Sequence, residues 1–197
     1  MLKRLFDLFF SLIGVIILLP LLLFVSIWVI IDSKGGIFYF QERVGKNGKG
    51  FKLLKFRTMT VGADKEGLLT IGAKDRRITN AGYWLRKYKL DELPQLINVL
   101  MGDMSLVGPR PEVRKYVNLY SAEQLRVLQV KPGITDFASI EYSNENELLA
   151  GVDEPDKVYA DEIMPAKILL NLQYINSPGL LTDCKIIFLT LKKVIRN

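Results

Sequence analysis

The sequence predicts a helix-rich α+β protein with an apolar helix at its N-terminus. Three observations lead to this fold class. No charged residue occurs from Leu8 to Ile31, one short pair of β segments occupies 37–59, and helical patterns fill most of the chain after residue 79. Strands do not alternate with helices, so a doubly wound parallel sheet is not expected. We therefore expect a small β-hairpin in a helical domain, with amphipathic helices at a membrane interface.

The N-terminal apolar segment is long enough to cross a bilayer. A helix rises about 1.5 Å per residue, and the hydrocarbon core is roughly 30 Å thick. The apolar run is too long for a cleavable signal peptide, and no small-residue cleavage site follows it. Lys3 and Arg4 precede the segment and Lys34 follows it. Positive charge marks the cytoplasmic side of a membrane, so both flanks favour that side.

Pro20 lies in the middle of this segment, where proline removes a helical hydrogen bond and kinks the helix. Two topologies are compatible with these residues. One is an ordinary single span with a tolerated proline. The other is a helix that enters the membrane, bends at Pro20 and returns to the same side. Prolines are common in membrane helices, so the residues alone favour the single span.

Turn and capping signals define the remaining elements. They are a strand pair at 37–40 and 51–59 around a glycine-rich turn at 46–50, a helix at 79–100 broken near Leu90, a rigid loop at 105–111, helices at 111–120, 121–129 and 157–176, an acidic loop at 141–156, and a helix at 180–196. The last helix is amphipathic, with apolar residues 181, 187, 188, 191 and 195 on one face and basic residues beside them. It fits a helix lying in a membrane interface, or a terminal helix packed on the core.

Composition excludes several kinds of chemistry. The chain has no histidine, so a Ser-His-Asp or Cys-His site and histidine metal ligands are excluded. Cys184 is the single cysteine, which excludes an internal disulfide and a cysteine zinc site. Acid–base or nucleophilic chemistry must therefore fall to Asp, Glu, Lys, Tyr, Ser or Thr.

Positive charge is concentrated between Arg43 and Lys89. This stretch has thirteen basic residues against three acidic ones, within a chain of net charge +6. Such a basic half beside a membrane segment indicates phosphate, either on a lipid headgroup or on a substrate. A solvated face that follows the positive-inside rule explains many of the lysines equally well. The arginines beside glycine and proline fit phosphate better, because the planar guanidinium suits it.

Two adjacent carboxylates, Asp91 and Glu92, lie in the densest polar segment of the chain. At a helix start they would act as ordinary capping residues. The functional alternatives are a shared Mg²⁺ that bridges phosphate oxygens, or an attack on phosphorus that gives an acyl phosphate. Arg110 follows in the sequence Gly-Pro-Arg-Pro, where Pro109 and Pro111 restrict the backbone. This rigidity suits a guanidinium presented to a diphosphate, although the turn is also a common way to begin a helix.

Several ordered motifs resemble the bacterial sugar-transferase family, the monotopic phosphoglycosyl transferases. They are Gln41-x-Arg43-x-Gly45, Lys55-Phe56-Arg57-Thr58-Met59, Arg76-Arg77-Ile78-Thr79, Gly82 with Arg86, Leu90-Asp91-Glu92-Leu93-Pro94-Gln95 with Asn98, Gly102 to Pro111, and Pro132-Gly133-Ile134-Thr135. The resemblance runs from the N-terminal helix to about Thr135, and more loosely to the end of the chain. It is closest to the minimal bacillosamine-type transferases of bacterial N-linked protein glycosylation.

The resemblance implies an activity. A UDP-sugar, such as UDP-N,N′-diacetylbacillosamine, and a polyprenyl phosphate such as undecaprenyl phosphate would give a polyprenyl-diphosphate-linked sugar and UMP. The reaction would need Mg²⁺ and follow a ping-pong course through a phosphosugar on an aspartate. Asp91 would be the nucleophile, and Glu92 would bind Mg²⁺ with it or assist the second step. Arg110, with Pro109 and Pro111, would contact the nucleotide or its phosphate. Further expected substrate contacts are Lys55, Arg57, Arg86 and Gln95.

The resemblance also implies a location. Residues 1–33 would form a re-entrant membrane helix kinked at Pro20, and residues 34–197 a catalytic domain on the cytosolic face of the inner membrane. Expected partners are the UDP-sugar, the polyprenyl phosphate, the bilayer and downstream glycosyltransferases. A different class of function stays open, a non-catalytic membrane-anchored adaptor that binds anionic lipid or a partner protein. Nucleic acid is not expected, because aromatic residues do not interleave with the basic ones.

Overall fold

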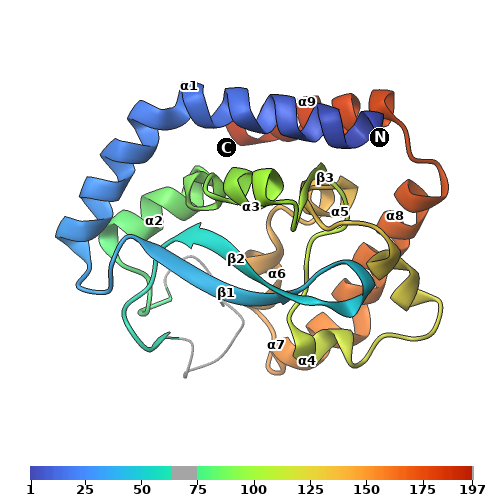
Figure 1. Cartoon of the computed structure of the whole chain (residues 1–197). Helices are drawn as coiled ribbons and strands as arrows, with labels where there is room; N and C mark the ends of the chain where they lie inside the picture. The colour runs from blue at the N-terminus through green and yellow to red at the C-terminus, as the bar shows by residue number, and fades with distance from the viewer. Residues whose placement is uncertain (64–74, 197) are drawn as a thin grey trace.

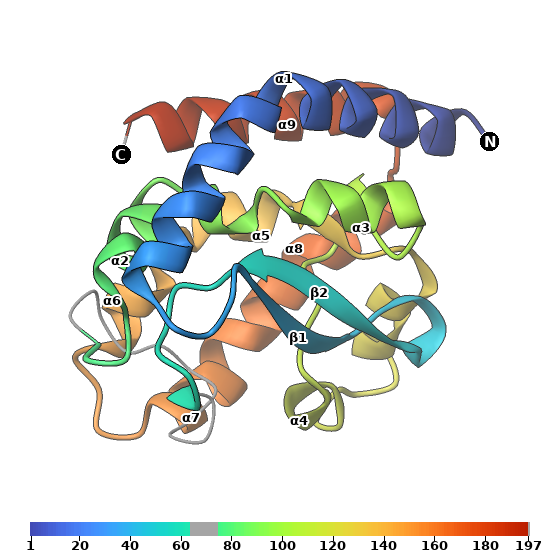
Figure 2. The same cartoon turned by 60° about the vertical axis from the view of Figure 1, so that its left-hand side comes forward.

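The computed structural model describes residues 1–63 and 75–196, which form a stack of layers (Figures 1 and 2). The first layer holds helices α1 (Leu2–Asp32) and α9 (Leu180–Arg196). Beneath it lie α2 (Asn80–Lys87) and α3 (Gln95–Met101), followed by the antiparallel strands β2 (Gly50–Phe56) and β1 (Phe38–Val44). α4 (Arg114–Val117) and α7 (Pro155–Val158) lie at the far end. The predicted helix-rich α+β class is confirmed.

The apolar segment forms one helix, α1, that bends about halfway along its length (Figures 1 and 2). Pro20 lies inside this helix and has no N–H to donate to the preceding turn, which explains a bend there. Its buried positions are Asp7, Ser11, Val25 and Val29. Large exposed side chains cover the rest, among them Phe9, Ile16, Ile17, Phe24 and Ile31. Among the described residues, α1 is the one helix long and apolar enough to cross a membrane.

Polar side chains fix the first turns of α1 to the domain. Arg4 donates to the carbonyls of Val99 (2.6 Å) and Leu100 (3.1 Å) at the end of α3. These carbonyls lie in the last turn of α3, at the negative end of its dipole, so a cation there is favourable. The buried Asp7 carboxylate accepts from Ser105 Oγ at 2.8 Å and from the backbone N–H of Leu106 at 3.1 Å.

The other end of α1 is fixed to the same domain. Asp32 Oδ2 accepts from the backbone N–H of Ala81 at 2.8 Å, in the first turn of α2. That N–H also lies at the positive end of the α2 dipole, which a carboxylate stabilises. Val25 and Val29 pack with Phe56 and Leu85 in one buried cluster. Both ends of α1 therefore bind one folded body.

The hairpin is positioned by α3. Its register runs from Phe38 opposite Phe56 to Val44 opposite Gly50. Asn98 of α3 accepts from the N–H of Leu54 and donates to the carbonyl of Lys52, both at 2.9 Å. This side chain replaces a strand partner on the outer edge of β2, and it thereby fixes the backbone directly before Lys55.

A short parallel strand pair, β3 (Ser105–Val107) and β4 (Gly133–Thr135), was not predicted. Gly108 and Gly133 allow its close packing. A Cβ added to Gly133 would lie 2.1 Å from the backbone nitrogen of Gly108, a distance that real atoms do not adopt. The Pro109 carbonyl accepts from the N–H of Gly133 at 3.0 Å, so the strand pair also fixes the Gly-Pro-Arg-Pro loop.

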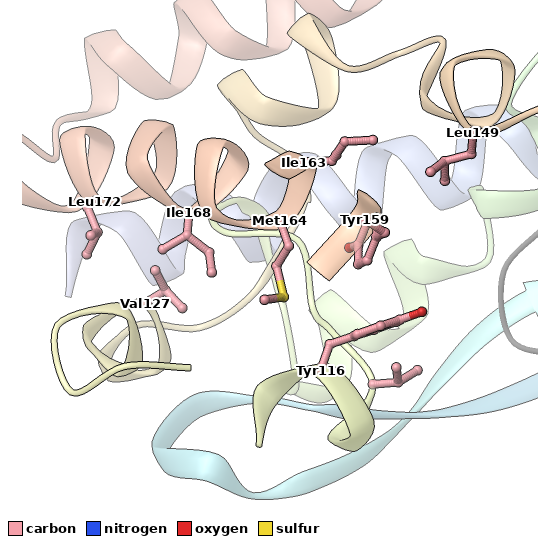
Figure 3. Packing of buried hydrophobic residues seen from close by; sticks show 9 residues of the cluster. Tyr116, Val127, Leu149, Tyr159, Ile163, Met164, Ile168 and Leu172 are labelled. Carbon is pink, nitrogen blue, oxygen red and sulfur yellow. The ribbon is translucent and has the colours of Figure 1, made fainter. Parts of the chain in front are cut away.

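The remaining helices pack around a second core (Figure 3). This core lies between α8 (Met164–Asn176), the π turn η5 (Tyr159–Ile163), α6 (Glu145–Leu149), α4 and the 3-10 helix η4 (Gln124–Gln129). Its buried side chains are Val113, Tyr116, Val127, Leu149, Tyr159, Ile163, Met164, Ile168 and Leu172. The helix predicted at 180–196 is confirmed as α9, and its apolar face is largely exposed at Leu181, Phe188, Leu191 and Ile195.

Four predicted elements differ from the structure in extent or type. The helix at 111–120 shrinks to α4, because the Glu112 carbonyl accepts from Val44 N–H and keeps that stretch extended. The helix at 121–129 has its predicted capping bonds between Ser121 and Gln124, yet continues only as a 3-10 helix. The helix at 157–176 is interrupted by η5, since Pro165 cannot donate to the preceding turn. The loop at 141–156 contains α6.

We expect Asp7→Ala to lower the free energy of unfolding by about 1–3 kcal/mol, because it leaves the buried Ser105 hydroxyl and the Leu106 N–H without an acceptor. Thermal unfolding of the full chain in detergent micelles measures the effect. Ser26→Ala is the matched control, since the Ser26 hydroxyl bonds only to the Leu22 carbonyl of its own helix. Equal unfolding temperatures for Asp7→Ala and wild type would show that the Asp7 contacts do not stabilise the fold.

Candidate active site

The two carboxylates lie on a single 3-10 turn, η3 (Leu90–Glu92), between α2 and α3. Lys89 adopts the left-handed conformation with φ 56°, which ends α2 and reverses the chain. The break predicted near Leu90 is therefore confirmed. The alternative role of the two carboxylates as helix caps is not confirmed. Asp91 makes no capping bond, and α3 begins after Pro94 without any side-chain cap. Asp91 and Glu92 therefore need another explanation than helix capping.

Glu92 is held by two cations from distant parts of the chain. Lys55 Nζ on β2 lies 3.1 Å from Glu92 Oε1. Arg110 donates one guanidinium N–H to Oε2 at 3.0 Å and a second to Oε1. Burial alone would raise the pKa of Glu92, but Arg110 and Lys55 outweigh it and hold the pKa well below its usual value. Glu92 is therefore ionised, and it fixes both cations in place.

Asp91 has the opposite environment. Its side chain is buried, with 7% of its surface exposed, and within residues 1–63 and 75–196 its carboxylate makes no hydrogen bond or ion pair. Burial and the neighbouring negative charge of Glu92 raise the pKa of Asp91, while Lys55 and Arg86 oppose the rise. Two adjacent carboxyl groups with pKa values shifted in opposite directions are suited to different roles. Asp91 is the one with oxygens available to react.

Arg86 comes to this site from α2. Its Nε donates to Thr58 Oγ1 at 2.8 Å, and its charge interacts with Asp91. Burial lowers the pKa of Arg86, and Asp91 opposes that effect. Gly82 permits the approach of α2 to this strand end, because a Cβ there would lie 2.1 Å from the Thr58 carbonyl oxygen. The resemblance placed Gly82 and Arg86 together, and this contact gives the physical reason.

Arg110 is positioned by Asp136, which sequence reasoning missed. The fully buried Asp136 accepts from the backbone N–H of Arg110 at 2.8 Å through Oδ2. Its other oxygen caps α5 (Phe137–Glu141) by accepting from Ser139 N–H. The pattern Asp-x-x-Ser predicts a helix cap at this position. Nothing local in the sequence indicates that the same carboxylate reaches Arg110.

The other predicted contacts divide into two groups. Lys55, Arg86 and Arg110 gather around the carboxylates. Gln95 is buried one turn beyond Asp91, and its Nε2 has no partner in the described part of the chain. Arg57 instead donates to the carbonyls of Gly36 and Phe38, both at 3.2 Å, and supports the segment before β1. Its substrate contact stays a prediction. Pro111 accepts from Arg43 through its carbonyl at 3.1 Å.

Asp91 and Glu92 are also the residues that could hold Mg²⁺ here. Mg²⁺ prefers carboxylate oxygens and is typically bound by one or two carboxylates together with water and substrate phosphates. The open carboxylate of Asp91 fits this pattern. Glu92 fits it less freely, since both of its oxygens already accept from cations. Within the described ranges, no group of three or more His, Cys, Asp or Glu side chains forms a fuller metal site.

These opposite environments predict opposite effects on stability. Asp91→Asn removes a buried carboxylate whose ionisation costs free energy at pH 7, so this variant should be at least as stable as wild type. Glu92→Gln leaves Lys55 and Arg110 without their counter-charge and should lose on the order of 3 kcal/mol. The contribution of Glu92 is present at neutral pH and is lost as the pH falls through its lowered pKa. Chemical unfolding of both variants at pH 7 measures the difference, and a Glu92→Gln protein as stable as wild type would contradict it.

Comparison with known proteins adds to this geometry. The family model for the bacterial sugar transferases matches residues 1–197. A Bacillus subtilis protein whose provisional name is undecaprenyl-phosphate N-acetylgalactosaminyl 1-phosphate transferase is 49% identical over 110 residues, 56% of this chain and 62% of that protein. The uncharacterized sugar transferase EpsL of B. subtilis is 38% identical over 98% of this chain and 87% of its own length. The undecaprenyl-phosphate glucose phosphotransferase of Komagataeibacter xylinus is 37% identical over 98% of this chain.

The chain spans only part of some of these relatives, 36% of the K. xylinus protein and 62% of the first B. subtilis protein. The family match, in contrast, covers the whole chain, from α1 through the carboxylate turn to α9. The resemblance expected from the motifs is thereby confirmed at the level of the family. The chain belongs to the bacterial sugar transferase family.

Proposed function

We propose that this protein transfers a sugar 1-phosphate from a UDP-sugar to a polyprenyl phosphate such as undecaprenyl phosphate, and releases UMP. The observation that carries the proposal is the buried, unbonded Asp91 carboxylate, which lies beside Lys55 and Arg86 and next to Glu92. The names of the relatives agree with this chemistry, since the K. xylinus protein is an undecaprenyl-phosphate glucose phosphotransferase. A histidine-free site also requires a nucleophile of another type.

The proposed course has two displacements at the same phosphorus. An Asp91 oxygen attacks the sugar-linked phosphorus of the donor, the phosphoanhydride bond breaks, and UMP leaves with its electron pair. An oxygen of the polyprenyl phosphate then attacks the phosphosugar on Asp91 and releases the carboxylate. Attack of this kind needs positioning and neutralised charge more than a strong base. Lys55, Arg86 and Arg110 supply the positive charge, and Glu92 aligns Lys55 and Arg110.

Mg²⁺ belongs to the same proposal. Asp91 and Glu92 would hold it, and a bound Mg²⁺ neutralises charge on the phosphate oxygens of a diphosphate. The residues of the chain have the remaining tasks. Asp136 and the β3–β4 pair keep the Arg110 loop in place, and Gly82 allows Arg86 to approach the site.

We propose a monotopic placement on the cytosolic face of the inner membrane. Residues 1–33 would form the re-entrant helix, and residues 34–197 the catalytic domain. Support comes from the bonds at both ends of α1, since Arg4, Asp7 and Asp32 all bind one domain. The first half of α1 lies beside α9 in one layer of the molecule (Figure 1), and both helices carry exposed apolar side chains. A lipid acceptor would approach from this layer.

The sugar is a separate part of the proposal. UDP-N,N′-diacetylbacillosamine is the donor that the bacillosamine-type resemblance implies. The names of relatives include glucose for the K. xylinus protein and N-acetylgalactosamine for a B. subtilis protein. A donor panel must therefore contain all three UDP-sugars. Downstream glycosyltransferases would use the lipid-linked product.

A non-catalytic adaptor that binds anionic lipid or a partner protein is the second candidate. The basic residues between Arg43 and Lys89 and the exposed face of α9 favour it. Part of that basic stretch, including Lys65 and Lys74, lies outside the described residues. An adaptor would bind anionic liposomes in a salt-sensitive way without turning over any nucleotide sugar. Lipid or protein binding by an adaptor does not require the buried, unbonded Asp91 carboxylate beside Lys55, Arg86 and Lys89, so this carboxylate favours the transferase.

We expect Asp91→Asn to lower UMP release by at least about 1,000-fold, because the amide cannot act as the nucleophile. The assay combines the purified full chain, Mg²⁺, the panel of UDP-sugars and undecaprenyl phosphate. Wild type should release UMP over many turnovers only when the lipid is present. Without the lipid it should release a burst of UMP equal to the amount of protein. Asp161→Asn, at an exposed position, is the matched control.

Normal turnover by Asp91→Asn would refute the role of Asp91 as the nucleophile. The absence of UMP from folded wild type with every donor would refute the transferase, and liposome binding would then test the adaptor.

The proposed topology predicts that both flanks of α1 lie on the same side of the membrane. Single cysteines replace Leu2 and Lys46 in a Cys184→Ser background, and a membrane-impermeant thiol reagent is applied to intact and to permeabilised cells. Both positions should be labelled only after permeabilisation. Labelling of one position but not the other in intact cells would establish a single span and exclude the re-entrant helix.

A further inference from the structure

Lys89, the residue between α2 and the carboxylate turn, has a backbone conformation that is unusual for lysine. Within the described ranges, the non-glycine residues with a positive φ are Asn47 and Lys89, both at 56°. Asn47 lies in the turn of the hairpin, and asparagine adopts the left-handed conformation more readily than most residues. Helices that end in this conformation mostly have glycine there. Strained non-glycine residues cluster at functional sites, so a lysine at this position is informative.

The fold requires the conformation at this position but not the lysine side chain. The N–H of Lys89 donates to the carbonyl of Arg86 at 3.2 Å, which keeps Lys89 at the end of α2. The next residue, Leu90, packs against the buried cluster that contains Phe56 and Leu85. The chain must reverse between these two contacts, and glycine would do so with less strain. The lysine side chain therefore needs a functional explanation.

The charge of Lys89 acts on both carboxylates. Lys89 lies two residues before Asp91, so their Cα atoms are at most about 7 Å apart. Its side chain is exposed and makes no hydrogen bond or ion pair among the residues that the structure describes. Burial raises the pKa of Asp91, and the charge of Lys89 opposes this rise. The same charge joins Arg110 and Lys55 in lowering the pKa of Glu92.

Lys89 differs in its bonding from the other cations of the site. Lys55 and Arg110 both bind Glu92. Arg86 donates through its Nε to a threonine hydroxyl. An ammonium group carries three N–H donors. Those of Lys89 can bind an incoming phosphate without breaking a contact that holds the described fold together.

The in-line geometry of phosphoryl transfer indicates which oxygens Lys89 can reach. In the first displacement of the proposed course, UMP leaves on the side of the phosphorus opposite Asp91. In the second, the lipid phosphate attacks from that same far side, because Asp91 is now the leaving group. A cation on the Asp91 turn begins on the near side. It can reach the nonbridging oxygens of the phosphoryl group, which are present in both displacements.

We propose that Lys89 binds the nonbridging oxygens of the phosphoryl group as that group moves to and from Asp91. The inference rests on the proposed function for the reaction itself. The bond from phosphorus to Asp91 forms as the bond to UMP breaks, and it breaks again as the bond to the lipid phosphate forms. Lys89 keeps its proton through both steps and supplies positive charge. A lysine is suited to this task, because it binds phosphate as a compact point charge.

The test measures the two displacements separately, with the full chain in lipid nanodiscs, Mg²⁺ and the UDP-sugar that wild type uses best. Rapid-quench measurement of the UMP burst without lipid gives the rate of the first displacement. Addition of undecaprenyl phosphate to the pre-formed phosphosugar protein gives the rate of the second. Lys89→Gly and Lys89→Asn should each slow both steps at least about tenfold, an effect typical of losing one group that stabilises developing charge. Lys89→Arg keeps the charge and should remain within a few-fold of wild type.

Two controls separate this role from a structural one. Glycine and asparagine adopt the left-handed conformation readily, so Lys89→Gly and Lys89→Asn should unfold at temperatures close to that of wild type. Lys87→Gln is the matched control for the loss of a charge. The Lys87 ammonium lies over the rings of Trp84 and Tyr88, 5.2 and 5.6 Å from their centroids, and this variant should keep both rates.

The outcomes distinguish the inference from the proposed function. If Lys89→Gly and Lys89→Asn keep both rates, the role of Lys89 is overturned while the transferase proposal stands. Slowing of the UMP burst alone would make Lys89 a contact of the nucleotide, and slowing of the second step alone a contact of the lipid phosphate. Either result contradicts the inference, as does a loss of rate that parallels a fall in unfolding temperature. If folded wild type releases no UMP, both proposals are overturned.

Discussion

The ion pairs of the Glu92 carboxylate join three segments that are far apart in the chain. Glu92 itself lies on the turn between two helices, Lys55 reaches it from the hairpin, and Arg110 from the loop after β3. Two cations this close would repel each other without the carboxylate between them. Other contacts hold the segments that carry Lys55 and Arg110 in position. Asn98 fixes the strand that carries Lys55, and Asp136 fixes the loop that carries Arg110.

The neighbouring Asp91 shows what this arrangement achieves. Glu92 satisfies the cations, so Asp91 can remain unbonded in the same positive field. Burial works against its ionisation, which makes the carboxylate costly for the fold and available for chemistry. Functional sites commonly retain such groups at the expense of stability. Asp91 and Glu92 carry the same chemical group, yet their pKa values shift in opposite directions. The reason is that Glu92 binds two cations, while Asp91 binds none among the described residues.

Local patterns predicted the elements, while contacts between distant segments decided the rest. The apolar run, the glycine-rich turn and the amphipathic end predicted α1, the hairpin and α9. Asp91, Glu92, Lys55, Arg86 and Arg110 were all candidates from the sequence, and the fold brings them together. The β3–β4 pair and the short α4 were missed, because both depend on hydrogen bonds between segments that no local signal joins. Asp136 was missed for the same reason, since its pattern predicts only a helix cap.

The bonds at the two ends of α1 have a consequence for how this protein can form. Asp32 satisfies the start of the helix that carries Arg86, and Asp7 satisfies the strand that leads to Arg110. Helix α1 is thus an internal part of the fold and supplies bonds that another apolar helix could not. With the membrane placement proposed above, insertion of α1 into the bilayer and completion of the fold would be coupled. A soluble fragment beginning after residue 33 would lack these bonds, and exchange of α1 for an unrelated hydrophobic helix would not restore them.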